Sequence, residues 1–196
     1  MEVRAVTETE SDTRVVEGYA VRFNEPATFQ IGDTEYREII DPAALDKTDM
    51  RDVPFKYNHS DSFMIMARTR NNTLQLLRDD RGLKIRAQLA DTSDGRDLYE
   101  LIRRGDVDKM SFAFTVRGEN YDSKTRTRTI RDIDRLYDVS AVDFPAYDTT
   151  SISARGFFEL ESEKERKVLD SAAKRERQKQ KIRVLLGLTA KMEENE

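Results

Sequence analysis

The sequence predicts an α+β protein built mainly of short β-strands, with a few helices and a long helical C-terminal tail. Three observations support this fold class. Between about residues 13 and 150, short runs of β-branched and aromatic residues alternate with turn residues, which is typical of a sandwich or a barrel. Two segments within this region have helical signals instead. After Arg155 the composition changes to one rich in Glu, Lys, Arg, Ala and Leu.

The expected strands are recognised by their apolar alternation and by the turns between them. In chain order they cover residues 13–23, 37–40, 53–58, 63–70, 73–79, 83–89 and 111–117, then a strand that ends near 133 and one at 135–144. The pair Asn71-Asn72 predicts a hairpin turn between two neighbouring strands, and the segment 79–82 predicts a second one.

Two helices are predicted among the strands, and a third after them. Segment 41–46 has a proline in its first turn. Segment 93–105 can be capped by Ser93 or Asp94, has apolar residues at helical spacing and ends in Gly105. Residues 157–194 contain no proline and predict a charged helix in one or two pieces. We therefore expect a body at 1–155 and a helical tail at 156–196.

Composition excludes several classes of function. There is no cysteine, so disulfides, thiolate metal sites and cysteine nucleophiles are absent, as expected in a reducing cytoplasm. The single histidine excludes a metal site with several histidines within one chain. The net charge is -4, and an acidic body disfavours a nucleic-acid interface. The sequence has neither a membrane-spanning apolar run nor the apolar segment of a secretory signal, so we expect no membrane partner and no secretion.

His59 is a candidate general base. It lies in FKYNHSDSF, where a strand runs into a polar loop, and loops on a rigid scaffold often carry catalytic groups. An imidazole with an ordinary pKa of about 6.5 suits proton transfer near neutral pH. A purely structural role for a lone histidine is equally compatible with these observations.

Ser111 is a candidate nucleophile. Alternation along SFAFTVR places Phe112, Phe114 and Val116 on one face and Ser111 on the other. The aromatic face should pack into the core, so the face of Ser111 should line a cleft or meet solvent. An ordinary half-exposed strand serine has the same pattern.

Asp138 is a candidate orienting acid because it interrupts an otherwise apolar strand. Burying a carboxylate costs free energy unless it is hydrogen-bonded or paired. The N–H of an imidazole would satisfy it, as in a serine triad, and so would an arginine such as Arg135 or Arg68. Other serines near these segments are Ser60, Ser62 and Ser140, and other acids are Asp134 and Asp143. Triads are recognised by geometry, and there is no G-x-S-x-G motif, so the residues alone leave these alternatives open.

Four segments stand in this order along the chain: VVEGYAVRFNEPA, FKYNHSDSFMIMAR, DTSDGRDLYELIRRGDVDKMSFAFTV and LYDVSAVDFPAYDTT. Together they resemble segments of the prohead proteases of tailed phages, which are related in fold to the herpesvirus maturation proteases. The resemblance covers residues 13–155. The sequence departs from the family pattern at IMAR, at Ala113, where glycine is usual, and at Asp138, where glutamate is more usual.

The resemblance implies a closed β-barrel flanked by helices, with His59 as general base, Ser111 as nucleophile and Asp138 as orienting acid. It implies a serine endopeptidase that needs no cofactor or metal and that processes capsid and scaffold precursors inside the immature capsid, in the host cytoplasm. It further implies self-cleavage and self-association. The oxyanion hole is expected near 144–148. The alternative is a non-catalytic capsid assembly protein with a protease-like barrel, and a nucleic-acid-binding barrel is disfavoured because tryptophan is absent.

Overall fold

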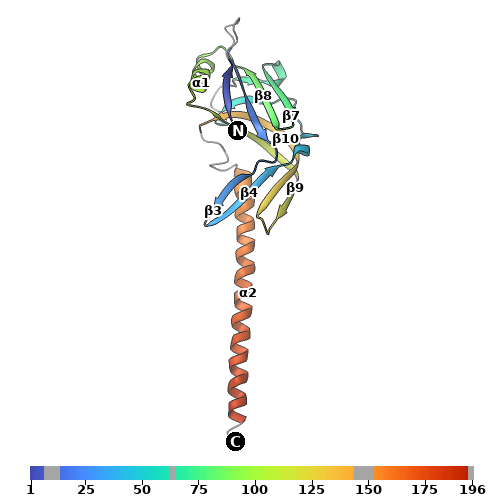
Figure 1. The fold of residues 1–196 in the computed structure, drawn as a ribbon, viewed down its shortest axis with the longest axis vertical. Helices are drawn as coiled ribbons and strands as arrows, with labels where there is room; N and C mark the ends of the chain where they lie inside the picture. The colour runs from blue at the N-terminus through green and yellow to red at the C-terminus, as the bar shows by residue number, and fades with distance from the viewer. Residues whose placement is uncertain (7–13, 62–64, 144–151, 194–196) are drawn as a thin grey trace. The chain divides into compact units, whose positions relative to one another are not determined.

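The computed structural model describes residues 1–6, 14–61, 65–143 and 152–193, and within the last segment the side chains of Ala154 and of 156–182. The chain divides into two compact units, Met1–Ile152 and Ser153–Glu196. The first unit contains the strands and the helix α1, and the second consists of the helix α2 (Figure 1). Each unit is described by itself below.

The first unit contains two β-sheets. One has the order β1-β2-β8-β7 and is antiparallel: β1 (Val3–Val6), β2 (Val15–Arg22), β8 (Gly82–Gln88) and β7 (Leu74–Asp79). The other has the order β3-β4-β10-β5-β6: β3 (Ala27–Ile31), β4 (Thr34–Ile40), β10 (Thr127–Val142), β5 (Pro54–Tyr57) and β6 (Ala67–Arg68), and β9 (Lys109–Asp122) pairs with β10. Figure 1 shows β7 and β8 side by side in the first sheet, and β3 and β4 in the second.

The long strand β10 organises the second sheet. It pairs antiparallel with β9 over its whole length. On its other edge it pairs in parallel with β4 at residues 127–130 and with β5 at residues 139–141. The sequence predicts two strands here, one that ends near residue 133 and one at 135–144. The structure has one strand with several bulges, which bend a strand without ending it.

The expectation of a closed barrel is wrong for the residues that the structure describes. In the described residues, the edges of the two sheets are linked by isolated backbone hydrogen bonds and not by a continuous ladder. Glu2 forms a single bridge with Lys109, and the N–H of Ala90 donates to the carbonyl of Met66 at 2.8 Å. A barrel needs a continuous ladder around its circumference. Glu2 lies outside β1, and Met66 lies outside β6, so neither contact extends a strand ladder and the sheets remain open.

One hydrophobic core lies within the first unit. It includes Val16 and Ile85 from the first sheet and Phe55 and Leu136 from the second. The helix α1 (Ser93–Arg104) contributes Leu98 and Ile102 to the same core. The prediction of this helix is confirmed, with one change at its start. The N-cap is Thr92, whose hydroxyl accepts from the N–H of Gly95 at 3.1 Å.

Several turns and short elements complete the unit. Segment 41–46 forms the 3₁₀ helix η1 (Pro42–Leu45), with Asp41 as its cap. The predicted hairpin at 79–82 is confirmed by the pairing of β7 with β8. The predicted hairpin at Asn71-Asn72 is wrong, because β6 pairs with β5 and a second 3₁₀ helix, η2 (Thr69–Asn71), intervenes. Strands β1 and β3 were not predicted, and residues 7–13 and 62–64 lie outside the described residues.

The second unit is one continuous helix, α2 (Ile152–Glu193), as the composition predicts. Among its described side chains, the exposed large apolar ones are scattered among charged ones: Leu160, Val168, Leu169 and Ile182. Ion pairs such as Lys167 with Glu163, at 3.0 Å and a spacing of four residues, run along its surface. No described helix is both long enough and apolar enough to cross a membrane.

Candidate active site

Three polar side chains share one face of the second sheet at the C-terminal end of β10. Asp138 and Ser140 are two residues apart on β10, so both point to the same face. In the antiparallel pair with β9, Ser111 lies directly opposite Ser140, and Ala113 lies opposite Asp138. Directly paired residues also share a face. The pairing therefore brings the predicted nucleophile and the predicted acid to one surface.

His59 reaches this surface from the neighbouring strand β5. The parallel pairing of β5 with β10 places Tyr57 beside Ala141. A hydrogen-bonded turn follows, in which the N–H of Ser60 donates to the carbonyl of Tyr57 at 3.0 Å. Both central residues, Asn58 and His59, are left-handed, with φ of 51° and 53°. Asparagine and histidine adopt this conformation more readily than most residues, but it is uncommon and often marks a functional turn.

The turn places the imidazole of His59 against Asp138. Nδ1 of His59 lies 2.6 Å from Oδ1 of Asp138. The Asp138 side chain is 8% exposed and that of His59 is 33% exposed. The Nε2 atom makes no hydrogen bond to a described residue. One nitrogen of the ring is thus bound to a buried carboxylate, and the other is available for a second partner.

Ser140 contacts both of these residues. Its hydroxyl donates to Oδ1 of Asp138 at 2.9 Å and accepts from the backbone N–H of His59 at 3.3 Å. The Oγ atom also lies 3.3 Å from Nδ1 of His59. Ser140 is fully buried. The buried Ser140 hydroxyl thus connects the backbone of His59 to the carboxylate of Asp138.

Ser111 lies beside this cluster without joining it through a hydrogen bond. Its neighbour Phe112 packs into the core, as the alternation predicts. The expectation that Ser111 meets solvent or an open cleft is wrong in this conformation, because it is 2% exposed. The structure gives its hydroxyl no hydrogen bond to a described residue, His59 included. Residues 138–142 on the adjacent strand are also buried, so both faces of the sheet are covered here.

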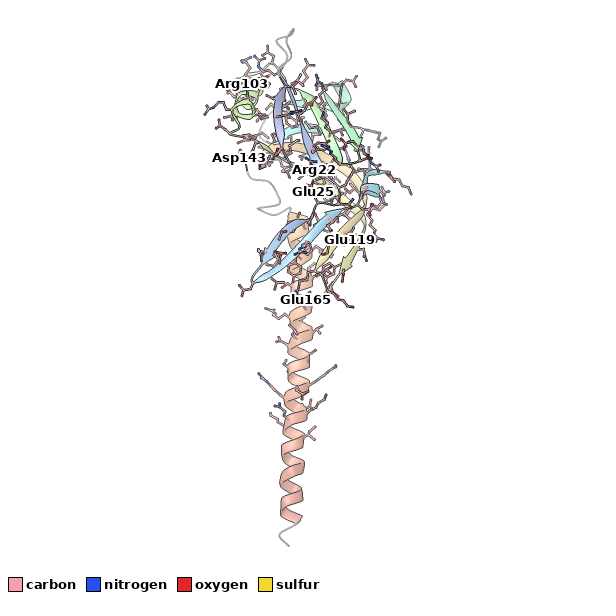
Figure 2. All side chains as sticks on the ribbon, in the orientation of Figure 1. Arg22, Glu25, Arg103, Glu119, Asp143 and Glu165 are labelled. Atoms are coloured by element: carbon pink, nitrogen blue, oxygen red, sulfur yellow. The ribbon has the colours of Figure 1, made fainter. Side chains whose placement is uncertain are left out.

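Asp143 holds the left-handed turn to the end of β10. Its carboxylate accepts from the hydroxyl of Tyr57 and, at 2.9 Å, from the amide of Asn58. Its own N–H donates to the Asn58 side chain at 3.1 Å. The hydrogen bond to Asp143 raises the pKa of the Tyr57 hydroxyl. Figure 2 labels Asp143 on the first unit and, at the other end of the long β9–β10 pair, Glu119.

The other candidates are engaged elsewhere. Asp134 binds Arg117, and Arg68 binds Asp52 at 2.5 Å. Arg135 lies over the ring of Tyr137. Ser60 closes the turn through its backbone. Ser62 and the oxyanion-hole segment 144–148 lie outside the described residues. Among the described residues there is no group of three or more His, Cys, Asp or Glu that could hold a metal ion.

Sequence reasoning missed the supporting roles of Ser140 and Asp143, and treated both only as alternatives to the main candidates. The signal for Ser140 is its spacing of two residues from Asp138 in a strand, which puts both on one face. No signal in the sequence links Asp143 to Asn58, because the two are 85 residues apart. Their contact depends on the pairing of β5 with β10.

Comparison with known proteins gives two matches. A family model described as Caudovirus prohead serine protease matches residues 1–165. The chain is 29% identical over 141 residues to the prohead protease of Enterobacteria phage HK97. The aligned region covers 71% of this chain and 59% of that protein. The chain thus spans less than two thirds of the length of this relative. No solved structure is significantly similar to this chain.

Proposed function

Because the chain belongs to the Caudovirus prohead serine protease family, we propose that it is a serine endopeptidase that processes capsid and scaffold precursors during prohead maturation. The observation that carries this proposal is the contact of His59 with Asp138, on the sheet face that also carries Ser111. We assign the activity to residues 1–155 and treat residues 156–196 as a charged tail. The protein acts inside the immature capsid, within the host cytoplasm.

In the proposed reaction, Ser111 is the nucleophile, His59 the general base and Asp138 the orienting acid. Oγ of Ser111 attacks the carbonyl carbon of a peptide bond, and Nε2 of His59 takes the hydroxyl proton. The imidazolium then gives that proton to the leaving amine, which leaves an acyl-enzyme. Water attacks the ester with His59 again as base, and the proton returns to Ser111 as the acid product departs. No cofactor enters these steps.

The register of the sheet supports the role of Ser111. Directly opposed residues on antiparallel strands have Cβ atoms about 4.5–5.5 Å apart. Ser111 is opposed to Ser140, and Ser140 touches His59. Since Ser111 is almost fully covered, a peptide must displace the side chains around it before attack. The oxyanion hole is expected from backbone N–H groups near 144–148, where each donor is worth about 3 kcal/mol.

The experiment that tests this function is co-expression of the chain with the capsid precursor of the same phage, followed by intact-mass analysis of the fragments. The wild-type chain should cut the precursor, and Ser111→Ala should leave it uncut. Ser123→Ala, at an exposed turn between β9 and β10, is the matched control and should cut normally. Processing by Ser111→Ala at the wild-type rate would exclude Ser111 as the nucleophile.

The same experiment discriminates the non-catalytic alternative. If the chain is a capsid assembly protein with a protease-like fold, the precursor should stay intact with the wild type, with Ser111→Ala and with Ser123→Ala. Capsid assembly should then not depend on Ser111.

Self-cleavage is tested on the protein alone. If the tail is removed by the enzyme, the wild-type chain should lose mass at high concentration while Ser111→Ala stays full length. A wild-type chain that stays whole while it cuts the precursor would exclude self-removal of the tail.

A further inference from the structure

Ser140 makes polar contacts that all lead to the residues proposed for catalysis. Its hydroxyl lies 2.9 Å from Oδ1 of Asp138, 3.3 Å from the backbone nitrogen of His59 and 3.3 Å from Nδ1 of the same histidine. It is 0% exposed. A fully buried hydroxyl is therefore shared between the backbone of the left-handed turn, the ring that the turn carries and the acid that binds the ring.

With Asp138 ionised and the ring of His59 neutral, the hydrogen count around Ser140 allows one consistent arrangement. A serine hydroxyl has one proton to donate and two lone pairs to accept with. The proton goes to the carboxylate of Asp138, and a lone pair accepts the backbone N–H of His59. An ionised carboxylate only accepts, so the short contact between Asp138 and His59 requires the proton on Nδ1. The neutral ring then carries its lone pair on Nε2, which is the nitrogen that a general base needs.

We propose that Ser140 is a positioning residue that holds His59 in this tautomer and orientation. The inference rests on the proposed function, because it concerns the same site. Ser140 ties the backbone of His59 to Asp138 and therefore fixes the ring relative to β10. Ser111 is the cross-strand neighbour of Ser140, so the same contact also fixes the ring relative to Ser111. Ser140 is not itself the nucleophile, because it is buried and its proton is committed to a carboxylate.

Because His59 is the only histidine, its ring can be observed directly. Two-bond ¹H–¹⁵N correlation spectra of the imidazole report which nitrogen carries the proton. We expect the Nδ1–H tautomer in Ser111→Ala, a background that prevents turnover. In the double variant Ser111→Ala/Ser140→Ala we expect a mixture of tautomers and loss of the downfield Nδ1–H signal. Ser111→Ala/Ser123→Ala, the matched control, should keep the spectrum of the background.

The kinetic test uses the otherwise native chain and a peptide that spans a cleavage site of the capsid precursor. Ser140→Ala should lower kcat about 10- to 100-fold, because a misplaced base costs rate. It should leave KM within about twofold, because Ser140 does not reach the substrate. Ser140→Cys keeps a polar group at this position, although the thiol is slightly larger and donates only weakly, and a folded Ser140→Cys should show the same loss.

Two outcomes would overturn the inference. In the first, a folded Ser140→Ala or Ser140→Cys keeps both the wild-type kcat and the Nδ1–H tautomer. In the second, kcat falls while the tautomer and the Nδ1–H signal are unchanged, which would mean a packing role only. Failure of the proposed function has a different signature. If Ser111→Ala cuts as fast as the wild type, the nucleophile is wrong, whereas the spectra of His59 still report what Ser140 does.

Discussion

The imidazole of His59 binds the carboxylate of Asp138 with 2.6 Å between Nδ1 and Oδ1, although the two residues are 79 positions apart. The contact forms because the parallel pairing of β5 with β10 ends beside it and a left-handed turn follows. Such a pair can form only once the sheet has assembled. It also removes the cost of burying an ionised carboxylate within an apolar strand, since a buried carboxylate is tolerated when it is hydrogen-bonded. The site and the stability of this end of the sheet are thus linked.

Asp138→Asn should lower kcat by about 10³- to 10⁴-fold, since an amide can donate to Nδ1 and so favours the wrong tautomer of His59. Peptide cleavage at saturating substrate measures this loss. Asp134→Asn is the matched control, because Asp134 is an exposed acid on the same strand that binds Arg117. Equal loss in both variants would show that the acid has been misassigned.

Substitutions of Asn58 should separate its backbone conformation from its hydrogen bonds to Asp143. Asn58→Gly keeps the left-handed conformation and loses those bonds, whereas Asn58→Ala loses both. We expect both to slow cleavage, and Asn58→Ala to be less stable than Asn58→Gly by about 1 kcal/mol. Urea unfolding measures the difference.

Asn24 provides the control for this pair, since it is also left-handed, with φ of 58°, and is exposed. The same difference between alanine and glycine should appear at Asn24, with no change in the rate of cleavage. A normal rate for Asn58→Gly would show that the bonds to Asp143 do not help to position His59.

Gly18→Ala should destabilise the first unit by about 1–3 kcal/mol, the usual cost of forcing extra atoms into packed structure. A Cβ atom there would lie 2.3 Å from the carbonyl oxygen of Glu2 and 2.8 Å from Sδ of Met110. Strand β1 must then move away from β2, and the adjacent bridge between Glu2 and Lys109 breaks. Gly156→Ala, where nothing lies within 4 Å, should be neutral or stabilising. Equal stability of the two variants would contradict this packing.

Glu17 should make the stability of the first unit more sensitive to acid. Lys84 lies 2.9 Å from its carboxylate and Arg86 lies 2.6 Å away on the adjacent strand. The hydrogen bond from Lys84, and then that from Arg86, lower the pKa of Glu17 below its ordinary value, although burial opposes them. The stabilisation is complete above the ordinary pKa of the unfolded chain and is lost as the pH falls through the lowered value of the folded one.

The free energy of unfolding should therefore fall less on acidification in Glu17→Gln than in the wild type, by about 1 kcal/mol. Denaturant unfolding at several pH values below neutral measures this. Glu25→Gln, at an exposed residue labelled in Figure 2, should follow the wild type. Parallel curves for Glu17→Gln and the wild type would refute the assignment.

Local pattern predicted most of the strands, because β2, β8 and the start of β9 alternate clearly and end at turn residues. It failed where local signals were weak or misleading. Strand β1 has four residues, too few to show a period. A strand end was predicted near residue 133, yet β10 continues through it, because pairing with β9 supports a bulged strand. Asn71-Asn72 resembled a hairpin turn, but β6 found its partner in β5 instead.

The sequence by itself determined which chemistry is available. Without cysteine, and with one histidine, His59 is the only imidazole and any triad must take its third member from an acid. Alternation alone placed Phe112 in the core and Ser111 on the opposite face. The tertiary structure decided which distant residues meet. It paired Asp138 with His59 rather than with an arginine, and it placed the Ser140 hydroxyl in contact with both residues. It also buried Ser111 and left the two sheets open. Short-range periodicity depends on neighbours in the chain, whereas these contacts depend on strand pairing between segments that the sequence does not connect.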